Sequence, residues 1–214
     1  MNGIKFMRNI VIIGGGGHAK VLIELIRTYN EYEIIGILDS QLKVKATVSE
    51  VPVLGGDALL PQLYTAGIKN VCIGVGSVKA NSKREMLYEK AKQLGFSVPY
   101  LLHPEAKVSK SVNLKEGVQV MMGAIVQTDS LIGENTIINT GSIIEHDCKI
   151  GKHIHVCPGA VISGGCIVGS GSFIGAGATI IQGIKVGRNS IVGAGAVVIN
   201  DIPDNTNVVG VPAK

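Results

Sequence analysis

The sequence predicts an α/β domain with a parallel sheet over residues 1–102, followed by a parallel β-helix over residues 103–214 that ends in a C-terminal tail. Two observations lead to this prediction. From residue 108 to residue 198 every sixth residue is aliphatic, without interruption. In the first hundred residues, β-branched apolar runs alternate with amphipathic stretches of helical period, which is the pattern of strands and helices around a parallel sheet.

The six-residue period is the stronger of the two signals, because it fits neither a helix nor one long strand. The residue two places before each aliphatic one is usually small, and residues two apart on a strand share a face, so both point inward. Short strands with a corner every six residues satisfy this pattern. Three such hexads close one triangular turn, and the turns stack about 4.8 Å apart. The aliphatic positions are Val108, Leu114, Val120, Val126, Ile132, Ile138, Ile144, Ile150, Val156, Ile162, Val168, Ile174, Ile180, Val186, Val192 and Val198.

A two-sheet sandwich is the alternative fold for this region. Its strands would be of irregular length, and they would not hold one register over sixteen hexads without an insertion. The hexapeptide β-helix is therefore favoured. Residues 200–214 are rich in proline and turn residues, and we expect them to form an extended tail lying on the prism.

In the first hundred residues, the apolar runs predict strands over residues 9–13, 33–38, 70–74 and 96–101, with a short strand or turn over 51–56. The amphipathic stretches predict helices over residues 19–29, 57–65 and 79–94, the second of them capped at its N-terminus. Proline at position 104 marks the seam with the hexads. These elements describe a Rossmann-like domain of about half the size of a full dinucleotide fold, so we expect it to bind one nucleotide.

The loop after the first strand indicates where that nucleotide binds. Gly14, Gly16 and Ala19 fit the G-x-G-x-x-G/A turn, which lets backbone amides and a helix N-terminus approach a phosphate. The second strand ends at Asp39, where an acid would meet a ribose hydroxyl. Because ligands bind beyond the carboxyl ends of parallel strands, this edge should also collect Gly17, His18 and Gly76. Tight strand-to-helix packing is the alternative explanation of the glycine loop.

Composition limits the classes of function. The net charge of +4 is scattered, with no basic run or aromatic-rich basic stripe of the kind that binds nucleic acid, although it suits an anionic small ligand. No signal peptide precedes the first strand, and no apolar stretch approaches the length of a membrane span. We therefore expect a cytoplasmic protein.

The four cysteines lack the spacing of a metal site, and we expect no metal. Cys148 and Cys166 lie eighteen residues apart at the small inward position, so they should stack in the core on consecutive turns. Only Cys157 is placed to face outward, where it would be the one candidate for a catalytic thiol.

A filled β-helix interior leaves no cavity, so a site must lie outside it or between chains. His146 lies at a corner after Ile144, beside Asp147, and a carboxylate orients a histidine and raises its basicity as a general base. A solvated surface histidine is the alternative. His155 lies nine residues on, half of one turn, and therefore on a different side of the prism. A site that uses both histidines needs two chains, and a flat-sided prism packs naturally in threes.

At this point three motifs resemble those of a known family: the opening IIGGGGHAKV, the central NTGSIIEHDCKIG followed by HIHV, and the closing VVGVPAK. Together they resemble the left-handed β-helix sugar O- and N-acetyltransferases of the NeuD/PglD family. The resemblance implies a left-handed coil, a homotrimer with sites between subunits, and acetyl-CoA as co-substrate. It implies that His146 is the base and that Asp147 raises its basicity.

The resemblance also implies binding residues. Asn139 would hold the acceptor sugar, and His155 would contact acetyl-CoA. The pantetheine arm would lie on Gly175, Ala176, Gly193 and Ala194. The nucleotide-sugar would be bound by Gly16, Gly17, His18, Asp39, Ser40 and Gly76.

From these features we expect acetyl transfer to a sugar, in particular to the 4-amino group of a nucleotide-linked deoxysugar used in surface glycan synthesis. The acceptor would attack the thioester directly, backbone amides would hold the oxyanion, and no acyl-enzyme would form. The choice of amine over hydroxyl rests on the nucleotide-type N-terminal domain, and O-acetylation of sialic acid is the first alternative. An NAD-dependent oxidoreductase, suggested by the glycine loop and Asp39, and a non-catalytic trimeric β-helix subunit are the others.

Overall fold

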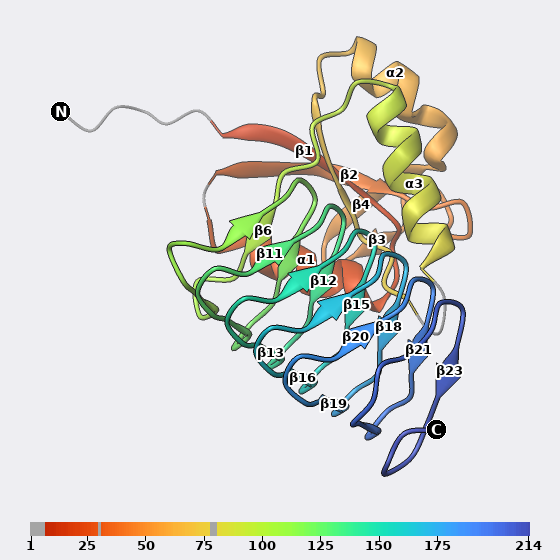
Figure 1. Ribbon diagram of the computed structural model, residues 1–214. Coiled ribbons are helices and arrows are strands. Elements are labelled where there is room, and N and C mark those ends of the chain that lie inside the picture. The colour runs from red at the N-terminus through yellow and green to blue at the C-terminus, as the bar shows by residue number, and fades with distance from the viewer. Residues whose placement is uncertain (1–6, 30, 78–80) are drawn as a thin grey trace, which may run out of the picture. The chain divides into compact units, whose positions relative to one another are not determined.

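The structure is a computed structural model that describes residues 7–29, 31–77 and 81–214. The chain divides into two compact units. The α/β unit contains the described residues up to Gly76 together with Lys83–Pro99, and the β-helix unit contains the described parts of Ser77–Ser82 together with Tyr100–Lys214 (Figure 1). Within the described ranges, no helix has the length and apolar character that crossing a bilayer requires.

The α/β unit is built on a five-stranded sheet of order β3-β4-β2-β1-β5. All neighbouring strands are parallel except β3 and β4. Helix α1 lies on the face of this sheet opposite α2 and α3 (Figure 1), as right-handed crossovers in opposite directions require. The elements are β1 (Arg8–Ile13), α1 (Gly17–Arg27), β2 (Tyr32–Leu38), β3 (Thr47–Val48), β4 (Val51–Gly55), a 3₁₀ turn η1 (Asp57–Leu59), α2 (Leu60–Thr65), β5 (Asn70–Ile73) and α3 (Ser82–Gln93).

The central strand β1 lies between β2 and β5, and its last four residues are at most 1% exposed. This burial explains why its sequence is a continuous β-branched run rather than an alternating one. The strands predicted over 9–13, 33–38 and 70–74 are confirmed to within one residue at each end. Helix α1 begins and ends two residues earlier than predicted. The helix predicted over 79–94 begins at Ser82, and the part of that prediction at 79–80 lies outside the described residues.

The strand predicted over 96–101 is wrong. Ser97 forms only an isolated bridge with Asn70, and Pro99 has no N–H with which to continue a ladder. Phe96 and Val98 are nevertheless 1% exposed and pack in the core of the α/β unit. The apolar pattern therefore reports burial here and not a strand.

Two further details differ from the prediction. The helical segment starting at Asp57 has no side-chain cap at its N-terminus, because its first turn is a 3₁₀ turn preceded by Gly56; the carboxylate of Asp57 instead pairs with Lys90. The β3–β4 hairpin was not predicted. Its turn residues Ser49 and Glu50 both have positive φ, without the Asn-Gly or Asp-Gly signal that usually marks such turns.

The β-helix unit consists of two-residue strands in three parallel sheets, and each strand before the last, β23, pairs with the strand eighteen residues away. We call the sheet that contains β13 face one, the sheet that contains β14 face two and the sheet that contains β15 face three. The strands of face one are β7 (Lys107–Val108), β10 (Ile125–Val126), β13 (Ile143–Ile144), β16 (Val161–Ile162), β19 (Thr179–Ile180) and β22 (Val197–Val198).

The strands of face two are β8 (Asn113–Leu114), β11 (Leu131–Ile132), β14 (Lys149–Ile150), β17 (Ile167–Val168) and β20 (Lys185–Val186). Those of face three are β6 (Leu101–Leu102), β9 (Gln119–Val120), β12 (Ile137–Ile138), β15 (His155–Val156), β18 (Phe173–Ile174), β21 (Ile191–Val192) and β23 (Asn207–Val208).

The interior follows the predicted hexad register. From Val120 to Val198 the sixth-position aliphatic residues are at most 2% exposed, and the small residues two places earlier lie in the same interior. Hydroxyls at the small position donate to corner carbonyls, as Ser130 does to Glu145 O at 2.8 Å and Thr136 does to Gly151 O at 2.9 Å. Such bonds satisfy polar groups that would otherwise destabilise an apolar core.

The coil extends beyond the hexads at both ends. At the start, β6 pairs with β9 in the regular register. At the end, β23 pairs with β21, and Ile202 bridges to Val186, each over sixteen residues instead of eighteen. The last residues therefore form a shortened final turn of the β-helix, and the expectation of an extended tail is wrong.

Candidate active site

The corner between faces one and two carries His146 and Asp147, which follow β13 after the single residue Glu145. Asp147 has a φ of +59°, the left-handed conformation that aspartate tolerates at a tight corner. This turn directs both side chains outward, with the imidazole 49% and the carboxylate 65% exposed. The Nδ1 atom of His146 lies 2.7 Å from Oδ2 of Asp147.

This contact determines the state of the imidazole. A carboxylate accepts hydrogen bonds only, so Nδ1 of His146 carries the proton, and Nε2 keeps its lone pair. The hydrogen bond to Asp147 raises the pKa of His146 above its ordinary value, and partial desolvation opposes that rise. The charges of Asp147 and Glu145 add to it. The pair has the arrangement of a general base and its orienting acid.

Gly164, on the next turn of the coil, lies against the His146 ring. A Cβ atom at Gly164 would lie 2.6 Å from both Cε1 and Nε2 of the imidazole, which is closer than non-bonded atoms approach. Sequence reasoning missed this residue. Counting eighteen residues on from His146 leads to Gly164, and this count could have found it.

His155 and Asn139 lie together on face three, where a chain of hydrogen bonds fixes both. The backbone N–H of Thr140 donates to Asn139 Oδ1 at 2.8 Å, so the amide nitrogen of Asn139 must donate to His155 Nε2, 3.0 Å away. His155 Nδ1 then carries the proton and donates to Ser77 Oγ at 2.8 Å. His155 is 6% exposed, and Phe173 packs edge-on against its ring.

Ser77, which holds the second nitrogen of His155, was not singled out from the sequence. It belongs to a segment that Asn81 also ties to the β-helix, through hydrogen bonds to the carbonyls of Gly171 and Ser172. No local signal marks Ser77, because the contact joins residues 78 positions apart.

The corner between faces three and one is lined by small residues on successive turns. Ala176 and Ala194 are exposed there, while Gly175 and Gly193 precede them at the ends of the strands. A Cβ atom at Gly175 would lie 2.5 Å from the backbone nitrogen of Ala194, so glycine permits the close stacking of the two turns. The corner residues, which we call the smooth corner, are Thr140, Gly141, Pro158, Gly159, Ala176, Gly177, Ala194 and Gly195.

The smooth corner and His146 lie at opposite edges of face one. The outward residues of this face from residue 125 onward are branched and half-buried: Ile125, Ile143, Val161, Thr179 and Val197. Face two differs, because its exposed outward residues alternate between apolar and charged: Leu131, Lys149, Ile167 and Lys185.

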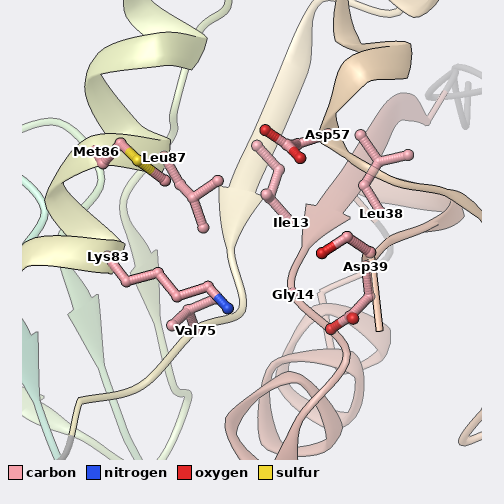
Figure 2. Close-up of a pocket in the computed structure, with 10 residues that line it drawn as sticks. Ile13, Gly14, Leu38, Asp39, Asp57, Val75, Lys83, Met86 and Leu87 are labelled. Carbon is pink, nitrogen blue, oxygen red and sulfur yellow. The ribbon is translucent and has the colours of Figure 1, made fainter. Parts of the chain in front are cut away.

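The predicted nucleotide edge of the α/β unit forms a pocket of about 130 Å³ at the carboxyl ends of β1, β2 and β5 (Figure 2). This is where the strand order reverses around β1, the usual ligand position in open α/β sheets. Gly14 shapes the first wall with a φ of +101°, and a Cβ atom there would lie 2.4 Å from Val75. The lining residues are Ile13, Gly14, Leu38, Asp39, Ser40, Asp57, Val75, Lys83, Met86 and Leu87.

Asp39 supports the glycine loop at this edge. Its Oδ2 accepts from the backbone N–H of Gly15 and its Oδ1 from that of Gln41, both at 2.8 Å. Burial acts to raise the pKa of Asp39, but backbone hydrogen bonds from Gln41, Gly15 and Leu42 and the charge of Lys83 lower it overall. The carboxylate is therefore ionised and held beside the loop.

The other residues predicted at this edge gather around the same loops. Gly16 and Gly17 are exposed at the start of α1, and a Cβ atom at either would meet nothing within 4 Å. A Cβ atom at Gly76 would lie 3.4 Å from His18 Cβ, so these two predicted residues are neighbours. Ser40 lines the pocket itself.

The cysteines are all buried. Cys148 and Cys166 stack on consecutive turns in the interior as predicted, both with 0% exposure. Cys157 does not face outward as expected: it is 6% exposed, and burial raises its pKa to about 12. Such a thiol stays protonated and shielded. Among the described residues, no group of three or more potential ligands could hold a metal ion.

Two family models match the chain. The PglD N-terminal domain matches residues 9–91, and the bacterial transferase hexapeptide (six repeats) matches residues 129–164 and 165–200. A curated relative, UDP-N-acetylbacillosamine N-acetyltransferase of Bacillus subtilis, is 37% identical over 126 residues. That match covers 54% of this chain and 52% of the relative, so the chain spans about half the length of this relative.

Solved structures match nearly the whole chain. PerB from Caulobacter crescentus, in complex with CoA and GDP-perosamine, is 44% identical, with a TM-score of 0.90 over 98% of this chain and 97% of that one. A mutant of perosamine N-acetyltransferase from the same organism, with the same ligands, is 42% identical, with a TM-score of 0.91 and the same coverage. The acetyltransferase domain of PglB from Neisseria gonorrhoeae, in complex with acetyl coenzyme A, is 38% identical, with a TM-score of 0.90 over 98% and 99%.

These matches extend through both units, and they establish the predicted fold class of an α/β domain followed by a left-handed parallel β-helix. This chain belongs to the hexapeptide-repeat sugar acetyltransferases of the NeuD/PglD family.

Proposed function

We propose that this chain transfers the acetyl group of acetyl-CoA to the amino group of a nucleotide-linked amino sugar. The observation that carries the proposal is the exposed His146–Asp147 pair, in which Nδ1 is bound to the carboxylate and Nε2 keeps its lone pair next to Gly164. It is supported by full-length relatives that are N-acetyltransferases crystallised with CoA and GDP-perosamine. These relatives favour the amine over the hydroxyl of a sialic acid as the acceptor.

In the proposed reaction the neutral amine attacks the thioester carbonyl of acetyl-CoA, and His146 Nε2 takes the proton that the nitrogen loses. The C–N bond forms, the C–S bond breaks, and the coenzyme leaves as a thiol after protonation by His146. Asp147 stabilises the imidazolium between these two transfers. The buried thiol of Cys157 has no part in the reaction, in keeping with its raised pKa and with direct transfer.

The thioester would lie along the smooth corner, with the pantetheine arm on Gly175, Ala176, Gly193 and Ala194. Small residues on successive turns suit a long thin chain that runs parallel to the axis of the coil. We assign His155 and Asn139 to the adjacent wall, where Asn139 would hold the acceptor sugar. A contact from His155 to acetyl-CoA would have to replace one of its present hydrogen bonds, to Asn139 or to Ser77.

The proposed assembly is a homotrimer. One chain carries the smooth corner and His146 at opposite edges of face one, so the two come together when face one of one copy meets another copy. The branched residues along this face support such contact, whereas the lysines of face two do not. A cytoplasmic location accords with the use of acetyl-CoA and with four free cysteines.

The α/β unit would bind the nucleotide through Gly16, Gly17, His18, Asp39, Ser40 and Gly76. In this assignment the open amides of Gly16 and Gly17 receive phosphate oxygens at the start of α1. The boundary near residue 102 then separates nucleotide binding from acetyl transfer, and the product would serve surface glycan synthesis.

The test is an assay of CoA thiol release by the full-length protein, with acetyl-CoA and a panel of acceptors: GDP- and UDP-linked 4-amino sugars, a free amino sugar and sialic acid. We expect turnover with a nucleotide-linked amine and none with sialic acid. Turnover only with sialic acid would establish the O-acetyltransferase alternative. Absence of thiol release with every acceptor, in a protein that sediments as a trimer, would contradict the proposal.

A further inference from the structure

The pocket of the α/β unit has room for one planar ring system. Its volume of about 130 Å³ is below the roughly 300 Å³ at which pockets for whole small molecules usually begin. Its walls are shared about equally by apolar and polar groups, and the apolar side chains include Met86 and Leu87 on one side and Leu38 on the other (Figure 2). Under the proposed function, the part of the substrate that fits such a slot is the nucleobase.

Two charged groups at the wall are available to read the edge of that base. Asp57 is ionised, since the hydrogen bond from Lys90 lowers its pKa, and its side chain is 34% exposed. An ionised carboxylate only accepts hydrogen bonds, while the ammonium of Lys83 only donates them. Lys83 extends into the space between Val75 and the acidic residues (Figure 2), and its charge acts on both Asp57 and Asp39.

The third charged group is already engaged. Both carboxylate oxygens of Asp39 accept backbone N–H groups, from Gly15 and from Gln41. Asp57 keeps more capacity, because Lys90 approaches a single oxygen, Oδ2, at 2.6 Å, and the other donor to this carboxylate is the backbone N–H of Asp57 itself. Among its charged groups, the pocket thus offers one acceptor with spare lone pairs and one donor.

Guanine, uracil, thymine and adenine differ in how they match this pair. Guanine presents two adjacent donors, N1–H and the N2 amino group, beside the acceptor O6. Uracil and thymine present a single N–H between two carbonyl oxygens, one of which would face the carboxylate. Adenine places an unprotonated ring nitrogen next to its amino group, which an ionised carboxylate repels.

We propose that this pocket binds guanine, with Asp57 accepting from N1–H and the N2 amino group and Lys83 donating to O6, so that the acceptor is a GDP-linked amino sugar. This inference rests on the proposed function. It agrees with the GDP-perosamine bound to relatives that match the full chain at 42–44% identity. The relative named for a UDP-linked sugar matches over about half the chain.

Isothermal titration of the full-length protein with GDP, IDP, UDP and ADP tests the assignment. IDP differs from GDP only in lacking the N2 amino group, and we expect it to bind about tenfold or more weakly, since one base-edge hydrogen bond to a carboxylate is lost. UDP and ADP should bind more weakly than GDP as well. Equal affinity for GDP and IDP, or tighter binding of UDP, would overturn the proposal.

A substitution that changes which base is preferred provides a second test. In Asp57→Asn the amide can donate to the C2 carbonyl of xanthine, so this variant should bind XDP more tightly than GDP, reversing the preference of the wild type. Lys90→Met is the matched control, because it breaks the same ion pair but keeps the carboxylate. It should still prefer GDP. A reversal in Lys90→Met, or none in Asp57→Asn when its thermal unfolding is unchanged, would overturn the role of Asp57.

The two proposals fail in different ways. Acetylation of a UDP-linked amine together with tighter UDP binding would overturn the guanine assignment and leave the proposed function in place. A preference for GDP without acetylation of any nucleotide-linked amine would overturn the proposed function and support the pocket assignment.

Discussion

The β-helix and the α/β unit position their functional residues by different means. In the β-helix the surroundings of a residue follow from counting: His146 lies between Thr128 and Gly164, eighteen residues before and after it. At the nucleotide edge the surroundings depend on three loops that follow β1, β2 and β5, each with its own geometry. Repetition therefore makes neighbours predictable, whereas a non-repeating sheet fixes only the place where its loops meet.

The largest expected effect concerns the two cores. Ile162 in the β-helix and Leu60 in the α/β unit both have 0% exposure and belong to separate clusters of buried residues. Replacing either by alanine should cost about 2–5 kcal/mol of unfolding free energy in its own unit. Hydrogen exchange resolved by segment measures this. In Ile162→Ala, faster exchange should spread to the stacked turns of Ile144 and Ile180. Faster exchange confined to a single turn would contradict the expectation that residues eighteen positions apart are packing neighbours.

The next effect concerns catalysis. His146→Ala should lower kcat/KM for acetyl transfer by about 100-fold or more, because the amine proton loses its acceptor. Initial rates of thiol release measure it. Lys185→Ala, an exposed change on face two, serves as the control and should retain the wild-type rate. Near-normal turnover of His146→Ala would remove this residue from the role of base.

A smaller effect is expected at Gly164, which lies eighteen positions after His146 and therefore next to it on the following turn. Gly164→Ala introduces a Cβ atom 2.6 Å from the present position of the imidazole, so the ring must move, and we expect kcat to fall about tenfold. The substitution should have no further effect when His146 is already alanine. A double-mutant cycle tests this point, and additive losses would show that Gly164 acts through another group.

The pH dependence tests the link between His146 and Asp147. The base is active when neutral, so kcat/KM should rise with pH and level off above the pKa of His146, which is raised from its ordinary value. In Asp147→Asn the hydrogen bond to a charged acceptor is lost, the pKa of His146 falls, and the rising limb should move to lower pH. A limb that stays in place would show that Asp147 does not set the basicity of His146.

The last prediction is that removal of the Cys157 thiol leaves the turnover rate unchanged. Cys157→Ala removes a buried thiol whose pKa is raised to about 12, and direct transfer predicts an unchanged kcat. Loss of activity without a loss of thermal stability would support an acyl-thiol intermediate instead.

The sequence predicted more of the β-helix than of the α/β unit. The hexads predicted the buried face of each strand from Val108 to Val198, since a strict period leaves one consistent register. They did not predict the final turn, because four residues instead of six separate Val198 from Ile202. In the α/β unit, Pro99 interrupts the strand predicted over 96–101, so this segment is irregular although its apolar residues are buried. Asp57 pairs with Lys90 instead of capping a helix.

The candidate site shows a similar limit. His146, Asp147 and the glycine loop could be identified because each shows its chemistry within a few neighbouring residues. Ser77 and Lys83 could not, since their positions depend on chain reversals over 78 residues to His155 and about 70 residues to the loop after β1. The sequence pattern contains no record of such distances.

The placement of His146 and the smooth corner at opposite edges of face one has a consequence for regulation. Under the proposed function, no single chain contains a complete active site, so specific activity should fall sharply when the protein is diluted below the dissociation constant of the trimer. By the same reasoning, a variant without the base and a variant with a blocked smooth corner should each be inactive alone and should restore turnover when mixed.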